Sequence, residues 1–388
     1  MKFNSMLPAA ALAVAWLTMF LVGTELYVFS PLLPLLAADY EVSLRVAGLS
    51  VAIFSSAYTV GAPLFGRVAD RIGKRRVLIW CMTAFAVANL LTASAPNFTS
   101  LLIVRIFAGA VAAGVSPTIY ALVGDTAPLD RRATRLALTV SGLLVALAVG
   151  ASMATLAASS FGRFGVFVAL AGFSLILAGL NYLVWPSQCC QTETTGLPLD
   201  PIALTPLMRR LMPMIVWSAG LYGVYTYLGT GLIAIGFTDG QVARAILSYG
   251  SGAIGGVLVG GRLADRLGTK YTAGASLAGL CVCFILLLLA LRAGVLIYLA
   301  LGLSSAVAQL FFPAQQSGLV KDFPTRRATA LAWNNSALFM GISLGSLIGG
   351  EAVTIGSFDT TLMIGAGIAL TGFLINWMVV PRPAAEPF

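Results

Sequence analysis

The segment GRVADRIGKRR, Gly66 to Arg76, returns later in the chain as GRLADRLGTK, Gly261 to Lys270. The two copies lie 195 positions apart. A second phrase, RRAT, repeats with the same offset, at Arg131–Thr134 and at Arg326–Thr329. Two independent matches at one offset predict that the chain is a duplication whose two halves run in the same direction.

Apart from these segments, the chain carries very little charge. Of its 388 residues, 59% are hydrophobic and only 10% are charged, and the mean hydropathy is +0.94. Soluble domains carry roughly 25% charged residues, so this chain has too few of them to cover a water-facing surface. The composition therefore predicts a membrane protein.

Twelve apolar stretches are long enough to cross a hydrocarbon core about 30 Å thick. They cover approximately residues 8–33, 46–66, 77–95, 99–122, 134–158, 164–185, 211–236, 242–261, 272–291, 294–318, 329–351 and 359–380. Backbone groups in lipid must be satisfied without water, so these stretches are expected to be helices. The first stretch is too long for a signal peptide and contains Glu25, so we interpret it as a membrane-spanning helix.

The expected fold class is an all-α membrane protein of twelve transmembrane helices, arranged as two parallel six-helix halves. We expect an N-terminal half over residues 1–185, a cytoplasmic linker rich in Pro and Thr over 186–210, and a C-terminal half over 211–388. Parallel halves around a cavity at the membrane midplane are an architecture of secondary transporters.

The net charge of +9 is distributed as an orientation signal. All lysines and arginines except Arg45, Arg105, Arg163, Arg244 and Arg292 fall in loops and tails on one side of the predicted helices. The positive-inside rule places that side, with both termini, in the cytoplasm. The basic excess therefore does not indicate nucleic-acid binding.

The residue types that support metal binding or catalysis are scarce. The chain has no His, and its five Cys are Cys81, Cys281 and Cys283 in predicted spans and Cys189 and Cys190 in the linker. None reaches the oxidising face, so we expect no structural disulfide and no metal site. Without a Ser/His or Cys/His arrangement or a phosphate-binding loop, we expect neither an enzyme nor a cofactor.

Both copies of the charged segment fall on the predicted turn between the second and third helix of their half. Gly66 and Gly73, like their counterparts in the second copy, allow a tight turn and close helix approach. Asp70 and Asp265 can interact with the positive N-terminal end of a neighbouring helix. Basic residues alone would serve membrane topology; the added Asp and Gly at fixed spacing predict a structural latch.

These segments resemble the major facilitator superfamily, and specifically its twelve-helix drug:proton antiporter group. GRVADRIGKRRVL follows the loop signature of that superfamily, and RIFAGAVAAG from Arg105 resembles its fourth-helix motif. GTELYVFSPLLPLLAADYEVS, FFPAQQSGL and NNSALFMGISLGSLIGG resemble bacterial exporters of arabinose, purine nucleosides and chloramphenicol. One segment departs: GASMATLAAS has Ser152 and Ala154 where the fifth-helix antiporter motif has Pro and Gly.

Glu25 is the leading candidate for a proton-binding residue, because it is the one acid that lies well inside a predicted span. At 1.5 Å per residue, Glu25 and Arg105 both fall in the outer half of a core about 30 Å thick. The two residues can therefore meet directly or through the cavity. The alternative is a structural role for Glu25, hydrogen-bonded to helix backbone.

The resemblance also implies a gate of charged residues at the cytoplasmic face. It would consist of Asp70, Arg71, Lys74 and Asp125, with Asp265 and Arg266 in the second copy. Such a cluster holds the cytoplasmic ends of the halves together in one state and releases them in the other.

Polar side chains within apolar helices are the candidates for lining a substrate cavity, because polar groups in lipid prefer the bundle interior. These candidates are Tyr58, Tyr222, Tyr225, Gln309, Gln315, Asn334 and Asn335. A largely apolar pocket with a few hydrogen-bonding groups suits a small amphipathic solute.

The expected function is proton-coupled export of small amphipathic solutes or drugs by alternating access, in a bacterial inner membrane. The partners are then a small-molecule substrate, protons and lipid, but not nucleic acid, and the chain is expected to be a monomer. Two alternatives are a facilitator or importer without proton antiport, which the altered fifth-helix motif favours, and a non-transporting membrane sensor.

Overall fold

The computed structural model describes residues 3–128, 132–186, 204–291, 296–324 and 327–380. Arg131, Arg326 and the linker cysteines Cys189 and Cys190 lie outside the described residues, as does the side chain of Asp70. Nearly all of the described chain is helical, in agreement with the predicted all-α class.

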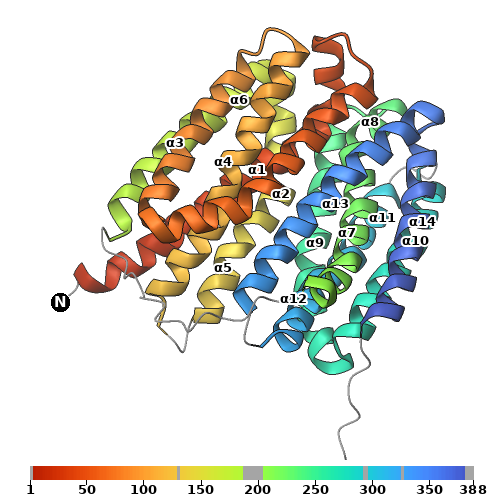
Figure 1. Ribbon diagram of the computed structural model, residues 1–388. Coiled ribbons are helices and arrows are strands. Elements are labelled where there is room, and N and C mark those ends of the chain that lie inside the picture. Colours follow the sequence, from red (N-terminus) through yellow and green to blue (C-terminus); the bar gives the residue numbers. More distant parts are fainter. Residues whose placement is uncertain (1–2, 129–131, 187–203, 292–295, 325–326, 381–388) are drawn as a thin grey trace, which may run out of the picture.

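The helices form two bundles that lie side by side, red to yellow-green for the first half and green to blue for the second (Figure 1). The first bundle contains α1 (Phe3–Asp39), α2 (Leu44–Ile72), α3 (Lys74–Ala93), α4 (Phe98–Thr126), α5 (Arg132–Val145), the π-helical turn η2 (Ala146–Gly150) and α6 (Ala151–Val184). The second contains α7 (Leu204–Thr226), α8 (Leu228–Ala234), α9 (Asp239–Leu267), α10 (Thr269–Ala290), α11 (Leu296–Gln309), α12 (Phe311–Asp322), α13 (Arg327–Ile355) and α14 (Phe358–Val379).

The described chain has enough helices for the twelve predicted crossings. Ten helical segments are long and apolar enough to cross a membrane, and one of them, 135–184, has 50 residues. Gly162, with φ 62° and ψ −174°, breaks this segment into two spans. The helix α7 and the short helix α8, which begins directly after Tyr227, supply the remaining crossing.

The two copies of the charged segment form the same turn. Gly73 ends α2 with φ 100° and ψ 131°, and Gly268 ends α9 with φ 89° and ψ 154°. Both angles lie in the region that glycine adopts without steric penalty. Because successive spans alternate in direction, both turns lie at the end where α1 begins and α14 ends (Figure 1). We refer to this as the inner end, since the charge distribution predicts that it faces the cytoplasm, and to the other as the outer end.

The 195-residue offset also relates contacts inside each half. Arg75 donates to the carbonyl of Tyr182 at 2.5 Å and lies 4.4 Å from the centre of the Tyr182 ring. Its equivalent Lys270 donates to the carbonyl of Trp377 at 2.9 Å and lies 5.2 Å from that ring. In both halves a basic side chain therefore binds the carbonyl end of the last helix, where positive charge is favourable.

Equivalent residues also meet each other across the boundary between the bundles. The hydroxyl oxygens of Tyr27 and Tyr222 are 3.4 Å apart, and these residues are separated by 195 positions. Ser30 donates to the carbonyl of Tyr225 across the same offset. Contact between equivalent positions is expected close to a two-fold axis, so α1 and α7 pack beside the axis that relates the halves.

Glycines bring α9 and α11 into backbone contact. A Cβ atom added at Gly256 would lie 2.8 Å from the Cα of Ala306, and one at Gly252 would lie 2.9 Å from the Cα of Gly302. Gly255, the neighbour of Gly256, has no atom within 4 Å of such a Cβ. Small residues at helix interfaces allow this close approach in membranes.

We expect Gly256→Ala to destabilise the folded protein by about 1–3 kcal/mol, because the backbone of Ala306 cannot move aside cheaply. Gly255→Ala is the matched control, and it should be neutral or stabilising by up to about 1 kcal/mol through helix propensity. Thermal unfolding of the purified variants in detergent measures both. Equal loss of stability in the two variants would contradict the packing described here.

Candidate functional site

Glu25 and Arg105 form an ion pair inside the first bundle. Glu25 comes from α1 and Arg105 from α4, and each side chain is 1% exposed. The Arg105 Nη1 donates to the Glu25 Oε1, and its Nε donates to the carbonyl of Ser50 on α2 at 3.2 Å. Three helices therefore meet at one guanidinium. Among the described residues, Glu25 is the only buried acid.

Two aromatic rings enclose the guanidinium of Arg105. Its central carbon lies 3.8 Å from the centre of the Phe29 ring and 4.1 Å from that of Phe54. The absence of a side chain at Gly109 on α4 permits this approach, since a Cβ there would lie 3.0 Å from the Cα of Phe54. The aromatic faces favour the charged guanidinium and separate it from solvent. The Glu25 Oε2 has no hydrogen-bond partner among the described residues.

The π-helical turn η2 packs against α1 next to the acid. A Cβ at Gly23 would lie 2.7 Å from that of Ala146, and one at Gly150 would overlap Thr24. On its other side η2 contacts α9 of the second bundle, where a Cβ at Gly250 would overlap the backbone of Ala148. The fifth span therefore joins the helix that carries Glu25 to the opposite half, and π-helical turns are frequent at functional sites.

A small pocket lies at the boundary between the two bundles. Its walls come from α1, α2, α7 and α13, and the residues lining it are Leu26, Tyr27, Ser30, Val51, Tyr222, Tyr225, Thr226 and Ile342. The rings of Tyr27 and Tyr222 stack nearly in parallel, with centroids 6.4 Å apart. The Tyr225 hydroxyl donates to the carbonyl of Tyr27 at 3.2 Å.

Contacts between α2 and α13 extend from the middle of the bundle to its outer end. The Tyr58 ring stacks on Phe339 with centroids 3.6 Å apart, and the Asn335 Nδ2 lies 3.4 Å from the Tyr58 hydroxyl. Further out, Ser346 donates to the carbonyl of Gly48 at 2.8 Å. At the outer surface Arg45 pairs with Glu351, and both side chains are about half exposed.

The inner ends of the bundles are not joined in the same way. The innermost hydrogen bond between the halves, among the described residues, runs from Thr59 on α2 to the carbonyl of Ser336 at 3.4 Å. Thr59 precedes the end of α2 at Ile72 by 13 positions, which corresponds to about 20 Å of helix. Among the described residues, the hydrogen bonds between the bundles therefore run from their middle to their outer end, and none joins the inner part of α2 to the second bundle.

The structure brings together only part of the predicted cytoplasmic gate. The Lys74 Nζ lies 2.6 Å from the Asp125 Oδ2, and this ion pair joins α3 to α4 within the first bundle. Arg71, Asp265 and Arg266 are exposed. No ion pair among the described residues links the two copies of the charged segment.

The predicted cavity residues fall into separate groups. Tyr222 and Tyr225 line the pocket, and Tyr58 and Asn335 join the halves beside it. Gln309, at the end of α11, is buried. Gln315 and Asn334 lie elsewhere, in a buried network of the second bundle.

That network centres on Arg210 of α7. The sequence places Arg210 at the end of the expected linker, but α7 already begins at Leu204, so the linker ends earlier than expected. Gln315 donates to the carbonyl of Arg210 at 2.8 Å and to Asn334 at 3.5 Å. The Arg210 Nε donates to Asp322 at 2.5 Å. These contacts tie α7, α12 and α13 together, so Gln315 and the side-chain oxygen of Asn334 have partners within one half.

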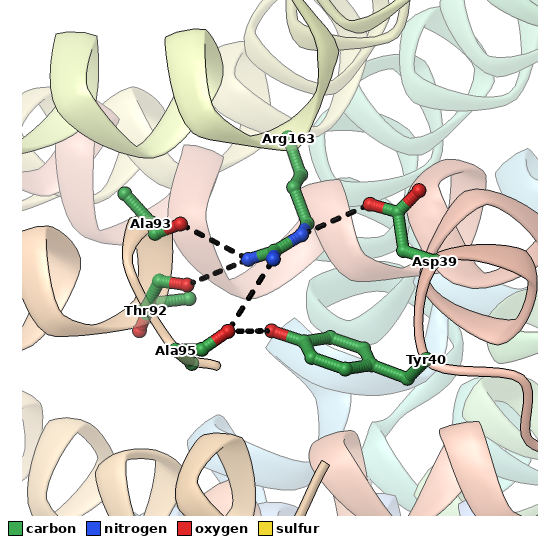
Figure 2. A network of polar contacts seen from close by, with 6 residues as sticks. All are labelled: Asp39, Tyr40, Thr92, Ala93, Ala95 and Arg163. Carbon is green, nitrogen blue, oxygen red and sulfur yellow. Dashed lines mark hydrogen bonds and ion pairs between the residues drawn. The ribbon is translucent and has the colours of Figure 1, made fainter. Parts of the chain in front are cut away.

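Arg163 forms a second network, which the sequence did not predict, at the outer end of the first bundle (Figure 2). Its guanidinium donates to the carbonyls of Thr92 at 3.3 Å, Ala93 at 3.0 Å and Ala95 at 3.3 Å. Its Nε donates to Asp39 at 2.9 Å. Arg163 follows the helix break at Gly162, and this break directs it onto the carbonyl end of α3, where a cation is favourable.

Tyr40 completes the network at the end of α1. Its hydroxyl donates to the carbonyl of Ala95 at 3.0 Å, and the guanidinium of Arg163 lies 4.7 Å from its ring (Figure 2). Burial raises the pKa of the Tyr40 phenol, and the charge of Arg163 opposes part of that rise. The phenol therefore stays protonated at neutral pH and keeps its donor role. The outer ends of α1, α3 and α6 are fixed as one unit.

Comparison with known proteins identifies the family of the chain. The family model of the Major Facilitator Superfamily matches residues 15–233 and again residues 202–388. The chain belongs to the major facilitator superfamily. As a member, it is a multi-pass membrane transporter and not an enzyme, and its fold of two parallel six-helix halves agrees with the prediction from the sequence.

Relatives in this superfamily match most of the chain. The MFS-type transporter YtbD of Bacillus subtilis is 29% identical over 94% of this chain and 94% of its own length. The inner membrane transport protein YdhP of Escherichia coli is 24% identical over 97% of this chain and 96% of its own length. A chloramphenicol resistance protein of Streptomyces lividans is 29% identical over 67% of both chains.

Solved structures of the superfamily share the fold. A D-xylose-proton symporter superimposes with a TM-score of 0.80 over 98% of this chain and 99% of its own, at 16% identity. A bacterial homologue of the human lysosomal transporter Spinster, in an inward-facing and occupied conformation, gives a TM-score of 0.77 over 99% and 100%, at 15% identity. At these identities the likeness establishes the fold alone.

We expect Arg105→Met to destabilise the protein by about 3–5 kcal/mol, because it leaves the Glu25 carboxylate buried without its partner. The double variant Glu25→Leu/Arg105→Met removes both charges and should recover most of the lost stability. Thermal unfolding in detergent measures the three proteins. A double variant no more stable than Arg105→Met would contradict an energetic role for the ion pair.

We expect Arg163→Lys to destabilise the first half by about 1–3 kcal/mol, because an ammonium group cannot replace the fork of guanidinium donors at three carbonyls and a carboxylate. Arg244→Lys, at an exposed arginine of α9 on the same side of the membrane, is the control. Limited proteolysis between α3 and α4 reports local opening. Equal cleavage rates in the two variants would remove Arg163 from this role.

Proposed function

We propose that the protein is a proton-coupled exporter of small amphipathic solutes in a bacterial inner membrane, working by alternating access. The observation that carries this proposal is the ion pair of Glu25 and Arg105, buried in the same helix, α1, that forms part of the pocket between the halves. A charged group inside a membrane protein is costly and is a functional candidate by default.

Protonation of Glu25 is the proposed coupling step. It removes the negative member of the pair, while Arg105 keeps its bond to the Ser50 carbonyl and its contacts with two aromatic rings. In a low-dielectric interior the loss of this attraction is large, so the packing of α1 against α4 weakens. Because α1 also contacts α7 through Tyr27 and Ser30, a change in its position reaches the interface between the halves.

Alternating access then consists of rocking the N-terminal half, residues 1–185, against the C-terminal half, residues 211–388. In the proposed opposite state the outer contacts separate, including the pair of Arg45 and Glu351. Asp70, Arg71, Lys74 and Asp125, with Asp265 and Arg266 of the second copy, then close the inner end as a gate. A set of ion pairs that forms in one state and breaks in the other is a known type of switch.

Export as the direction is supported by one relative. The chloramphenicol resistance protein of Streptomyces lividans, by its name, protects cells from a drug, and efflux is a means by which a membrane transporter does so. A predicted position in the bacterial inner membrane, with both termini cytoplasmic, agrees with the name of the inner membrane transport protein YdhP.

A facilitator or importer without proton antiport is the second candidate. The observation that favours it is Ser152 and Ala154 in the fifth span, in place of the Pro and Gly of the antiporter motif. The turn η2 lies in the same span and packs closely on both α1 and α9. Close packing of this span therefore does not require the Pro and Gly of the motif.

Transport in proteoliposomes tests the proposal. We expect an imposed proton gradient to drive efflux of a solute found in a screen of antibiotics, sugars and nucleosides, beginning with chloramphenicol. Glu25→Gln should reduce driven efflux to the level of protein-free vesicles while leaving the protein folded, because the amide cannot exchange a proton. Glu41→Gln, at an exposed glutamate, should transport at the wild-type rate.

Undiminished gradient-driven efflux in Glu25→Gln would remove this residue from the coupling role. Solute movement that leaves the pH inside the vesicles unchanged would favour the facilitator instead.

A further inference from the structure

Tyr227 is buried near the outer end of the protein, where a tyrosine would ordinarily face the membrane surface. It occupies the break between α7 and α8, where its N–H donates to the carbonyl of Val224 at 3.2 Å and its own carbonyl accepts from the Gly231 N–H at 2.9 Å. Tyrosines at the ends of spans are typical of the interfacial aromatic belt. Tyr227 is instead 0% exposed, so its ring and hydroxyl are held inside the protein.

Three glycines on two other helices form a slot around this ring. On α13, a Cβ atom added at Gly349 would lie 2.9 Å from the Tyr227 ring, and one at Gly350 would lie 2.7 Å from the hydroxyl oxygen. On α2, a Cβ at Gly48 would overlap the hydroxyl oxygen and lie 2.8 Å from the ring carbon that carries it. We refer to Gly48, Gly349 and Gly350 as the glycine slot. It accommodates the ring because none of these positions carries a side chain.

Two hydrogen bonds connect the ring to both walls of the glycine slot. The Tyr227 hydroxyl donates to the carbonyl of Ser346 on α13 at 3.0 Å, and the Ser346 hydroxyl donates to the carbonyl of Gly48 at 2.8 Å. The ion pair of Arg45 and Glu351 lies beside the slot, since a Cβ at Gly350 would lie 3.4 Å from the Arg45 Cα. Tyr227 is therefore packed where α2 and α13 meet at the outer end.

The glycine slot combines residues from both halves of the protein. Tyr227, Gly349 and Gly350 belong to the second half, so their contacts move with that half as a unit. Gly48 belongs to the first half, and the three atoms nearest to a Cβ added there all belong to Tyr227. The contact of Gly48 with the ring therefore exists only while the outer ends of α2 and α13 lie together.

The duplication does not repeat this arrangement at the 195-residue offset. The equivalent positions hold Leu32 for Tyr227, Ala243 for Gly48, and Ala154 and Thr155 for Gly349 and Gly350. Neither the aromatic ring nor the glycines are present there. The slot is therefore a feature of the contact between α2 and α13 and not a consequence of the turns that both halves share.

We propose that Tyr227 holds the outer end of the transporter closed by packing between Gly48 and the two glycines of α13. The inference rests on the proposed function in taking the halves to rock between two arrangements. Because protein interiors are close-packed, the closed arrangement requires that position 48 carry no side chain. A change that destabilises one of two arrangements shifts the population toward the other. A methyl group at position 48 therefore favours the arrangement in which the outer end is open.

The reaction of a reporter cysteine with a membrane-impermeant maleimide, added outside intact cells, tests this proposal. The reporter is Val51→Cys, at a buried position between the halves and one turn inward of Gly48. The reagent reaches it when the outer end opens. We expect Gly48→Ala to raise the labelling rate about tenfold, the ratio that overpacking of one close contact predicts. Protein without Val51→Cys gives the background from the native cysteines.

Gly349→Ala is the matched control, because it adds the same methyl group against the same ring from within the second half. It should lower the unfolding temperature of the purified protein and leave the labelling rate within about twofold of the wild type. Tyr227→Leu no longer fills the slot and should also raise the labelling rate. Since the clash at position 48 is then absent, adding Gly48→Ala to Tyr227→Leu should change the rate by less than about twofold.

The proposal would be overturned by an unchanged labelling rate in Gly48→Ala, or by equal increases in Gly48→Ala and Gly349→Ala. Independent, additive effects of Gly48→Ala and Tyr227→Leu would also overturn it. Thermal unfolding shows whether each variant is folded. If Gly48→Ala does not fold, Tyr227→Leu decides the question, because a labelling rate equal to that of the wild type contradicts a closing role for the ring.

Gradient-driven efflux in proteoliposomes separates this result from the proposed function. Labelling as expected, together with efflux that does not respond to the proton gradient, would retain the role of Tyr227 and contradict proton-coupled export. Driven efflux that depends on Glu25, together with labelling that Gly48→Ala leaves unchanged, would retain the exporter and contradict closure by Tyr227.

Discussion

The cost of burying charge in a membrane protein governs the organisation of the first half. A buried ionised group is tolerated when it is paired and hydrogen-bonded, and Glu25 and Arg105 are each 1% exposed. Their contact brings α1 against α4, and the Ser50 carbonyl adds α2. The rings of Phe29 and Phe54 follow from the same requirement, because they exclude water while favouring the cation. The central helices of this half are thus arranged around one guanidinium.

The second half is organised by a different interaction. There, glycines allow α9 and α11 to approach at backbone distance, and the buried cation Arg210 lies near the inner end, where it binds Gln315 and Asp322. The halves share their turns and their helix-end contacts at the 195-residue offset, but not their interior chemistry. The positions 195 residues after Glu25 and Arg105 are Gly220 and Ala300. The duplication is therefore kept in the path of the chain, its turns and its helix-end contacts, but not in the buried charged residues.

The sequence allowed the fold to be predicted because its signals are local or exactly periodic along the chain. Apolar stretches of membrane-spanning length, two phrases at one offset, and glycines at the turns each require only neighbouring residues. The meeting of Glu25 and Arg105 was also predictable, because the rise of a helix places both at a similar depth. Depth does not give direction, however. The sequence therefore left open whether the acid faces the pocket or the interior of its half.

The remaining contacts depend on residues far apart in the sequence. Nothing near Gln315 and Asn334 in the sequence indicates that Gln315 bonds to Arg210 and to Asn334, so both resembled cavity residues. For Arg163 the sequence indicated only a position in an outer loop, and its partners lie about 70 and 124 positions earlier. A glycine immediately before an arginine at a predicted outer turn was the available signal. It identifies a break in the helix but not the carbonyls toward which the break directs the side chain.

That Glu25 is the sole buried acid of the described chain sets a thermodynamic ceiling on the proposed cycle. One carboxyl group carries one proton per turnover, and moving one elementary charge across 100 mV is worth about 2.3 kcal/mol. Since about 1.4 kcal/mol corresponds to a tenfold ratio, this voltage sustains roughly a fiftyfold concentration difference of an uncharged solute. Steeper accumulation would require a contribution from the pH difference, because the chain holds no second buried carboxylate in its described residues to carry another proton.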